Sequence, residues 1–155
     1  MVAATTYLVD TSAIIGMTER VDQRPSLRDL MVEIDRDEAF CISVLTLGEL
    51  HHAVQASTDE RVRRQRQATL DRASLLAAVP IPLADSPAQA AAWLTTYGRL
   101  AAAYGRRLGA FDRWMLATAR QLGLHVLTED EALHAAALGE SVATTLLRSE
   151  PRGRA

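Results

Sequence analysis

The sequence predicts an α/β fold with a mainly parallel central sheet and helices on both of its faces. Short apolar runs of the kind that form buried strands alternate with longer segments whose apolar residues recur at helical spacing. The turns between them are short, and strands that alternate with helices in this way usually pair in parallel. With 155 residues, of which 48% are hydrophobic, the chain has the size and composition of one packed domain.

Four short runs are predicted to be strands. The first covers 6–9 and is broken by Asp10 and two hydroxyl residues, so Asp10 lies at the carboxyl end of that strand. Ligands of open α/β sheets bind at this edge, because strand ends and helix N-termini converge there. A simpler interpretation is that Asp10 or Thr11 only caps the next helix. The other strands are predicted at 39–43, at 124–128 and, at the edge of the sheet, at 142–147.

Seven segments have the apolar spacing of helices. The best marked follows Ser86, a capping hydroxyl residue, and has Pro87 at its first helical position. The segment that opens with Ser57-Thr58-Asp59-Glu60 is amphipathic and has a basic exterior. Two prolines make 79–83 an extended connector, and the residues 105–109 end a helix. The helices are predicted at 11–20, 26–34, 45–56, 57–78, 87–104, 110–122 and 131–138.

The composition narrows the classes of protein. The only cysteine, Cys41, allows no internal disulfide, which fits a reducing cytoplasm, and we expect it to be a buried small hydrophobe. No apolar run is long enough to cross a bilayer and the N-terminus lacks a secretory pattern, so we expect a cytoplasmic protein. All 17 basic residues are arginine, which excludes P-loop and Schiff-base chemistry. The net charge of -2 argues against a protein that binds nucleic acid over its whole surface, but it is compatible with a local basic stripe.

Four acids are predicted to meet at one edge of the sheet. Asp10 and Asp130 follow strands, while Glu49 and Asp112 lie in early turns of helices that enter from the same edge. Two carboxylates about 4 Å apart repel by roughly 4 kcal/mol at an effective dielectric near 20, so such a cluster requires cations or proton uptake. Mg²⁺ or Mn²⁺ is the natural counterion, because these hard ions take oxygen ligands.

Four segments around these acids resemble the motifs of a PIN domain, and within that superfamily those of a VapC toxin from a bacterial toxin–antitoxin pair. They occur in the family's order and span most of the chain. One departure is Leu133, where the family often has an aromatic residue, and another is the bulky Gly109-Ala110-Phe111 before Asp112, which would reshape the mouth of the cleft. The segments are Leu8-Val9-Asp10-Thr11-Ser12-Ala13, Ser43-Val44-Leu45-Thr46-Leu47-Gly48-Glu49-Leu50, Phe111-Asp112-Arg113-Trp114-Met115-Leu116-Ala117-Thr118-Ala119 and Val126-Leu127-Thr128-Glu129-Asp130.

The resemblance implies a PIN-like three-layer sandwich over residues 1–148, followed by a disordered tail at 149–155. It implies metal-dependent endonucleolytic cleavage of RNA, with Mg²⁺ as the cofactor and Mn²⁺ as an alternative. Asp10, Asp112 and Asp130 would bind the metal, Glu49 would bind metal or orient the attacking water, and Thr11 and Thr128 would be polar supports. The number of metal ions is left open.

The resemblance also implies a toxin of a type II pair that forms a homodimer and is inhibited by a cognate antitoxin. A basic antitoxin side chain in the acidic cleft would suit the clustered carboxylates. Arg106, Arg107 and Arg113 are candidate contacts for the RNA backbone. The arginines between 61 and 72 could guide RNA as well, although solvated helix faces carry such charges routinely.

Several alternatives remain open at this stage. A catalytically silent PIN domain that binds RNA or protein is the main one, and the complete set of four acids argues against it. A phospho-aspartate enzyme lacks its second aspartate and its lysine. Zinc binding by His51 and His52 is disfavoured because neighbours on a helix point apart. Trp114 could stack on an extruded base, but core or dimer packing is the simpler interpretation.

Overall fold

A computed structural model describes residues 5–19, 39–76 and 86–147 of the protein, and within these ranges four strands form one parallel sheet. The strands are β1 (Thr6–Val9), β2 (Ala39–Cys41), β3 (His125–Thr128) and β4 (Thr144–Leu146), in the spatial order β2-β1-β3-β4. Leu8 pairs with Cys41 on one side and with Val126 on the other, and Leu127 pairs with Thr145. The predicted parallel sheet is confirmed, and the last predicted strand lies at its edge.

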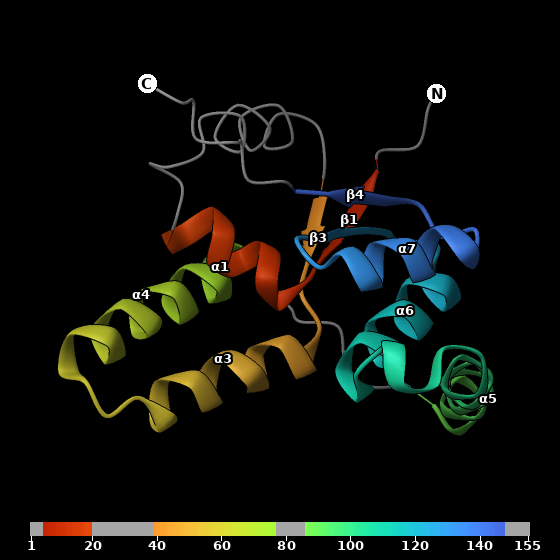
Figure 1. Ribbon diagram of the computed structural model, residues 1–155, viewed down its shortest axis with the longest axis horizontal. Helices are drawn as coiled ribbons and strands as arrows, with labels where there is room; N and C mark the ends of the chain where they lie inside the picture. Colours follow the sequence, from red (N-terminus) through yellow and green to blue (C-terminus); the bar gives the residue numbers. More distant parts are fainter. Residues whose placement is uncertain (1–4, 20–38, 77–85, 148–155) are drawn as a thin grey trace.

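The described helices form two layers, one on each face of the sheet (Figure 1). On one face lie α1 (Thr11–Glu19), α3 (Val44–Ala56) and α4 (Glu60–Leu76). On the other lie α5 (Pro87–Tyr104), α6 (Ala110–Leu122) and α7 (Glu131–Gly139), with the short 3-10 helix η2 (Gly105–Arg107) between α5 and α6. The structure therefore has the α/β three-layer fold predicted from the sequence.

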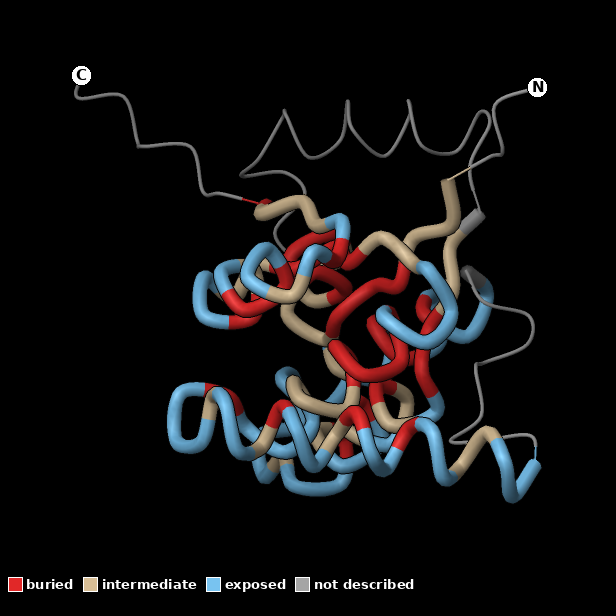
Figure 2. The backbone as a smooth tube through the Cα atoms, turned by 90° about the vertical axis from the view of Figure 1, so that its right-hand side faces the viewer, coloured by how far each residue is buried: buried red, intermediate tan, exposed pale blue. Residues whose placement is uncertain are grey.

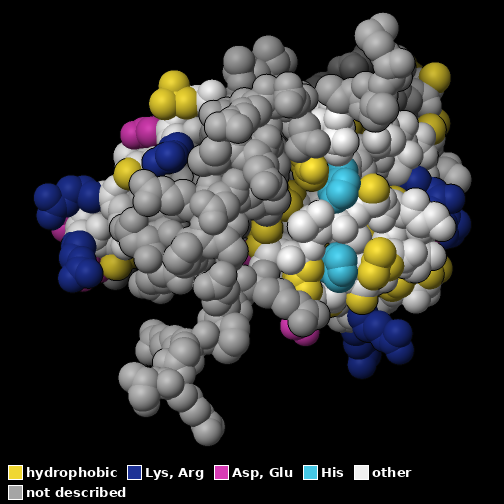
Figure 3. Space-filling model, turned by 90° about the horizontal axis from the view of Figure 1, so that it is seen from above, with side chains coloured by type: hydrophobic (Ala, Val, Ile, Leu, Met, Phe, Trp, Pro, Cys, Tyr) yellow, Lys and Arg dark blue, Asp and Glu magenta, His cyan; other side chains and the backbone are white. Residues whose placement is uncertain are grey.

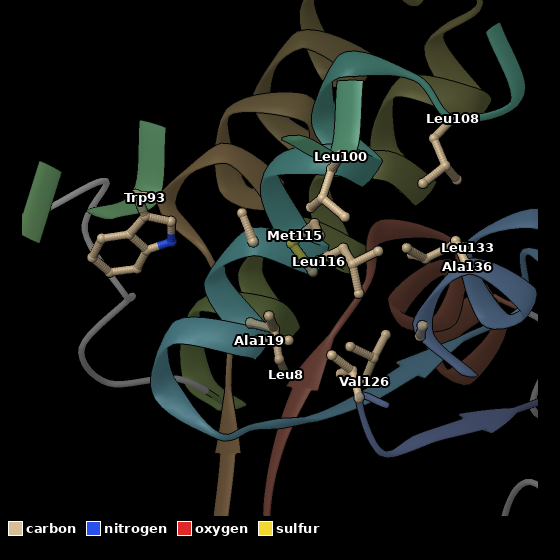
Figure 4. Packing of buried hydrophobic residues seen from close by; sticks show 13 residues of the cluster. Leu8, Trp93, Leu100, Leu108, Met115, Leu116, Ala119, Val126, Leu133 and Ala136 are labelled. Carbon is tan, nitrogen blue, oxygen red and sulfur yellow. The ribbon is translucent and has the colours of Figure 1, made fainter. Parts of the chain in front are cut away.

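Alternation along the central strands supplies a core to each layer. Leu8 and Val126 are fully buried against α5, α6 and α7, as the close view in Figure 4 shows. Their neighbours Val9 and Leu127 are buried against α1, α3 and α4. Because successive side chains of a strand point to opposite faces, two consecutive apolar residues serve both cores. Figure 2 shows that the buried residues concentrate at the centre and that the outer helix faces are exposed.

Local signals fix the helix ends near the predicted positions. Ser86 accepts a hydrogen bond from the N–H of Gln89 at 3.2 Å, and Pro87 stands in the first turn of α5. Asp59 caps α4 by accepting from the N–H of Arg61 at 2.8 Å. Gly123 ends α6 with a φ of 64°, a left-handed conformation that glycine adopts without strain.

Several predictions fall outside the described residues: the helix at 26–34, the extended connector at 79–83 and the tail at 149–155. The domain boundary at residue 148 also stays a prediction. Cys41 was expected to be buried, but it is only half-buried in β2, and this partial burial raises the pKa of its thiol to about 11. In the ranges that the structure covers, no helix has the length and apolar composition of a membrane span.

Candidate active site

Asp10 stands where β1 ends and α1 begins, and the residue is only 6% exposed. Its backbone N–H continues the ladder to β3 by donating to the carbonyl of Leu127 at 2.9 Å, and its carbonyl accepts from the N–H of Ile14 in α1. The Oδ2 atom accepts hydrogen bonds from the hydroxyls of Ser12 at 2.7 Å and Thr128 at 2.8 Å. The backbone thus fixes the position of Asp10, and the two hydroxyls fix its orientation.

Hydroxyl groups join the loops around Asp10 into one network. Thr11 donates a short hydrogen bond to Oε2 of Glu49, which links α1 to α3. The Ser12 hydroxyl accepts from the N–H of Glu129 at 3.1 Å, and the Thr128 hydroxyl accepts from the N–H of Asp130 at 3.0 Å. The ends of β1 and β3 are therefore held against each other by side chains as well as by the sheet.

Asp112 occupies the third position of α6, whose first turn begins after the capping residue Gly109. Burial raises the pKa of this carboxyl to about 6, and the negative charges of Asp10, Asp130 and, more weakly, Glu49 act in the same direction. The backbone N–H of Gly109 opposes this by hydrogen bonding to the carboxylate, as in one half of a capping box. These effects show that the three other acids lie near enough to disfavour a negative charge on Asp112.

Asp130 begins α7 and serves as its N-cap. Its Oδ1 atom accepts from the N–H groups of Ala132 at 2.7 Å and Leu133 at 2.9 Å. One oxygen of this carboxylate therefore caps α7, and the other oxygen has no hydrogen bond among the described residues. The helix cap and the predicted role at the acidic edge are compatible, because they use different oxygens.

The described structure brings the four predicted acids into one electrostatic neighbourhood, but their side chains do not converge on one ligation point. No group of three or more histidines, cysteines or acids in the described ranges is close enough to hold a metal ion. The ion pairs found there also leave these four acids without an arginine partner. Carboxylates and hydroxyls that crowd one another without a cation have the donor chemistry that fits Mg²⁺ or Mn²⁺.

Each of the two threonines predicted as polar supports bonds to one of the four acids, and a further hydroxyl that the sequence analysis missed does so too. Thr11 and Thr128 bond to Glu49 and Asp10 as described above. Ser12 makes an equally short bond to Asp10 but was not singled out among the hydroxyl residues that follow the strand. The sequence signal for Ser12 was its position two residues after Asp10, in the first turn of α1.

The predicted RNA contacts differ from one another. Arg106 and Arg107 are exposed on η2, just before α6. Arg113 is half-buried with its guanidinium 5.3 Å from the centre of the Tyr97 ring, and its buried Nε has no hydrogen-bond partner. On the face shown in Figure 3, the described basic side chains lie at the margins and form no continuous band.

Trp114 is part of the packing between α5 and α6. Its ring stacks on Trp93 with 6.5 Å between centroids and an interplanar angle of 8°, and it contacts Tyr97 at 5.7 Å. The indole of Trp93 is fully buried and donates to the hydroxyl of Thr118. Core packing is thus the role of Trp114 in this chain, as the simpler interpretation expected. His51 and His52 are both exposed on α3, and no zinc cluster forms in the described residues.

The fold and site define a three-layer α/β protein with an acidic edge at the carboxyl ends of its central parallel strands. A family model described as the PIN domain matches residues 7–138, and the chain belongs to this family. PIN domains are generally metal-dependent. A comparison with curated proteins gives no match.

Solved structures similar to this chain include members of VapBC and FitAB systems. VapBC-5 from Mycobacterium tuberculosis, a member of the VapBC family of toxin-antitoxin systems, is 28% identical with a TM-score of 0.63, covering 93% of this chain and 98% of that one. FitAcB from Neisseria gonorrhoeae is 27% identical with a TM-score of 0.61 and coverages of 89% and 95%. VapBC2 from Rickettsia felis, solved with a DNA fragment from their promoter, has a TM-score of 0.68 at 16% identity over 93% and 100%, which shows a shared fold.

Proposed function

We propose that this protein is the toxin of a type II toxin–antitoxin pair and a metal-dependent endoribonuclease. The observation that supports this most strongly is the gathering of four acids at the carboxyl edge of the sheet, where burial and then the charges of Asp10, Asp130 and Glu49 raise the pKa of Asp112 to about 6. Membership of the PIN family and the likeness to VapBC-5 point in the same direction. The proposed place of action is the cytoplasm.

Each acid has a proposed role in RNA cleavage. Asp10, Asp112 and Asp130 would hold Mg²⁺ or Mn²⁺, and Glu49 would bind the metal or position the attacking water. A bound divalent ion supplies charge neutralisation at the phosphate and lowers the pKa of a bound water. The chain's own hydroxyls prepare the site: Ser12 and Thr128 hold the Asp10 carboxylate, and Thr11 holds Glu49. Because burial and the nearby acids disfavour a negative charge on Asp112, a neighbouring cation would favour its charged form.

Inhibition is proposed to come from a second protein, the cognate antitoxin, acting on a homodimer of this chain. The VapBC-5 structure belongs to a family of toxin-antitoxin systems, which supports such a partner. A basic side chain from the antitoxin would compete with metal and RNA for the same carboxylates.

The experiment that tests this function is RNA cleavage by the purified protein. We expect cutting of an RNA pool with Mg²⁺ or Mn²⁺, no cutting in EDTA, and loss of cutting in an Asp10→Asn variant with an unchanged circular dichroism spectrum. Cleavage that persists in EDTA would contradict the metal mechanism. A wild-type protein that binds RNA but never cuts it would instead be a catalytically silent PIN domain.

A further inference from the structure

A pocket of about 560 Å³ opens beside the acidic edge, between one face of α3 and the start of α6. The α3 residues in it recur at helical spacing, so they form one stripe along the helix. Most of the lining is apolar, and two polar side chains interrupt it. Among the described residues the lining consists of Val44, Leu45, Gly48, Glu49, His52 and Phe111.

This pocket is continuous with the proposed active site. Glu49 belongs to both: it lines the pocket, and it accepts the hydrogen bond from Thr11 next to Asp10. Phe111 directly precedes Asp112 in the first turn of α6. A molecule in the pocket would therefore contact Glu49 and the residue that precedes Asp112.

The walls expose apolar surface that the fold leaves without a packing partner in the described residues. Phe111 is 47% exposed and Val44 is 38% exposed, whereas Met115 and Leu116 of α6 and Leu50 of α3 are buried. The other aromatic ring of α6, Trp114, is packed against Trp93. Phe111 is thus the ring of this helix that is available to a ligand.

We propose that this pocket binds a nucleobase of the RNA substrate, next to the phosphate that is cut, with the face of the base on Phe111 and its polar edge toward His52. The inference rests on the proposed nuclease function and extends it to base selection. Single-stranded RNA is read by splaying bases onto aromatic side chains, which offer a flat apolar face. The pocket's volume falls within the range of about 300–1,000 Å³ typical of small-ligand sites.

A second copy of the chain fits this pocket less well. A stable interface buries about 800 Å² on each partner, and a concave site needs a projecting group on the opposing surface. The six described residues that line this hollow are too few for an interface of that size. A base attached to a phosphate at the acidic edge needs only a single apolar slot that adjoins that edge.

The sequence offers a matched pair of substitutions to test this. Gly48 lines the pocket, and a Cβ added there meets nothing within 4 Å, so Gly48→Leu should place an apolar side chain in the pocket. Gly98 is also an exposed glycine inside a helix with nothing within 4 Å of an added Cβ, and it lies outside this pocket. Both changes replace glycine with a strong helix former, so neither should harm folding.

The measurement is fluorescence anisotropy in EDTA, with labelled RNA pentamers of adenosine, cytidine, guanosine or uridine and an abasic pentamer of equal charge. We expect the wild type to bind one of the four at least about tenfold more tightly than the abasic strand, as stacking of one base can supply. Gly48→Leu should lose this difference and Gly98→Leu should keep it. Phe111→Ala should also lose it, whereas Phe111→Trp should preserve it.

Three outcomes would overturn the assignment. One is equal binding, or no binding, of base-containing and abasic strands by the wild type, and another is an intact difference in Gly48→Leu. The third is a change of oligomeric state in Gly48→Leu by sedimentation velocity, which would make the pocket an interface between copies. RNA cleavage without base-dependent binding would contradict the role of the pocket and support the nuclease function. Base-dependent binding without cleavage would support the role of the pocket and contradict the nuclease function.

Discussion

The negative charge is compensated by neighbouring residues in one acidic region of this protein and not in the other. Glu140, at the end of α7, has a side chain that is 8% exposed and accepts hydrogen bonds from Arg99 at 3.2 Å, Arg120 at 3.0 Å and the Tyr104 hydroxyl at 3.1 Å. The hydrogen bond from Arg99 is the main reason that the pKa of Glu140 is lowered. Asp112 has no arginine partner in the described structure, and burial together with its acidic neighbours raises its pKa to about 6.

The difference between Glu140 and Asp112 shows that acids which connect helices are paired with arginines. A second inward acid, Glu19 of α1, is likewise paired, with Arg66 at 2.9 Å and the Thr69 hydroxyl at 2.9 Å from α4. An acid that joins helices is therefore matched with a cation in the same region. The four acids at the sheet edge receive hydroxyls and backbone N–H groups instead, which leaves their charge without a cationic partner among the described residues.

The largest expected effect that would break this comparison is on toxicity. Production of the protein without its antitoxin should halt growth, and Asp10→Asn or Asp112→Asn should restore growth, because removing a metal ligand costs several kcal/mol of charge stabilisation and thus at least about a hundredfold in rate. Glu140→Gln should remain toxic at equal protein levels. Growth curves after induction decide this, and arrest by the Asp10 variant as strong as by wild type would place toxicity outside the acidic edge.

A smaller effect is expected on the free energy of unfolding, and it should come from substitutions in the region around Glu140. Glu140→Gln removes a carboxylate that bridges two arginines and a tyrosine, so the free energy of unfolding should fall by about 1–3 kcal/mol in urea titration. Glu60→Gln makes the same change in the exposed ion pair with Arg63, whose side chains are 66% and 48% exposed, and should cost at most about 0.5 kcal/mol. An equal loss in both variants would mean that the Glu140 pairs are no more than surface contacts.

The smallest expected effect is the pH dependence of these changes, and its sign differs between the regions. Because the pKa of Asp112 is raised in the fold to about 6, its stabilising contribution is present below about pH 4 and is lost as pH rises through 6. The stability gained by Asp112→Asn in EDTA should therefore grow from pH 4 to pH 7.

Glu140 should behave in the opposite sense. Its pKa is lowered in the fold, so its contribution is present above about pH 4.5 and is lost as the pH falls below that value. The cost of Glu140→Gln should accordingly shrink on acidification. Urea unfolding at several pH values measures both differences, and parallel trends would contradict the contrast between the regions.

Much of the fold, and the nearness of the four candidate acids to one another, could be predicted from the sequence, because both follow from patterns along the chain. Helical spacing, Ser86 before Pro87 and the acids after strand runs are all readable along the chain. The arrangement of side chains depends on contacts between distant segments. The Ser12 hydroxyl matters because Thr128 and Glu129 come from β3 and its loop, 116 residues away in the case of Thr128.

The same limit applies to the aromatic residues of α6. Phe111 and Trp114 lie in one helix, but Trp114 is covered by Trp93 and Tyr97 of α5, whereas Phe111 faces the pocket beside α3. The bulk before Asp112 was recognised as a change at the mouth of the cleft, whereas the hollow between Phe111 and α3 could not be seen in the sequence. Likewise, the partnership of Glu140 with Arg99 and Arg120 joins three segments without any local signal.

The most direct test of the acidic edge is the effect of Mg²⁺ on the melting temperature of wild type, Asp112→Asn and Glu140→Gln. A ligand that binds only the native state at a hundred times its Kd stabilises it by about 2.7 kcal/mol. Mg²⁺ should therefore raise the melting temperature of wild type and Glu140→Gln by the same amount, and that of Asp112→Asn by much less. In EDTA, Asp112→Asn should melt about 2–4 °C above wild type, the shift that about 1 kcal/mol produces in a domain of this size. An equal rise in all three proteins, or no rise in wild type at millimolar Mg²⁺, would contradict a metal site at these carboxylates.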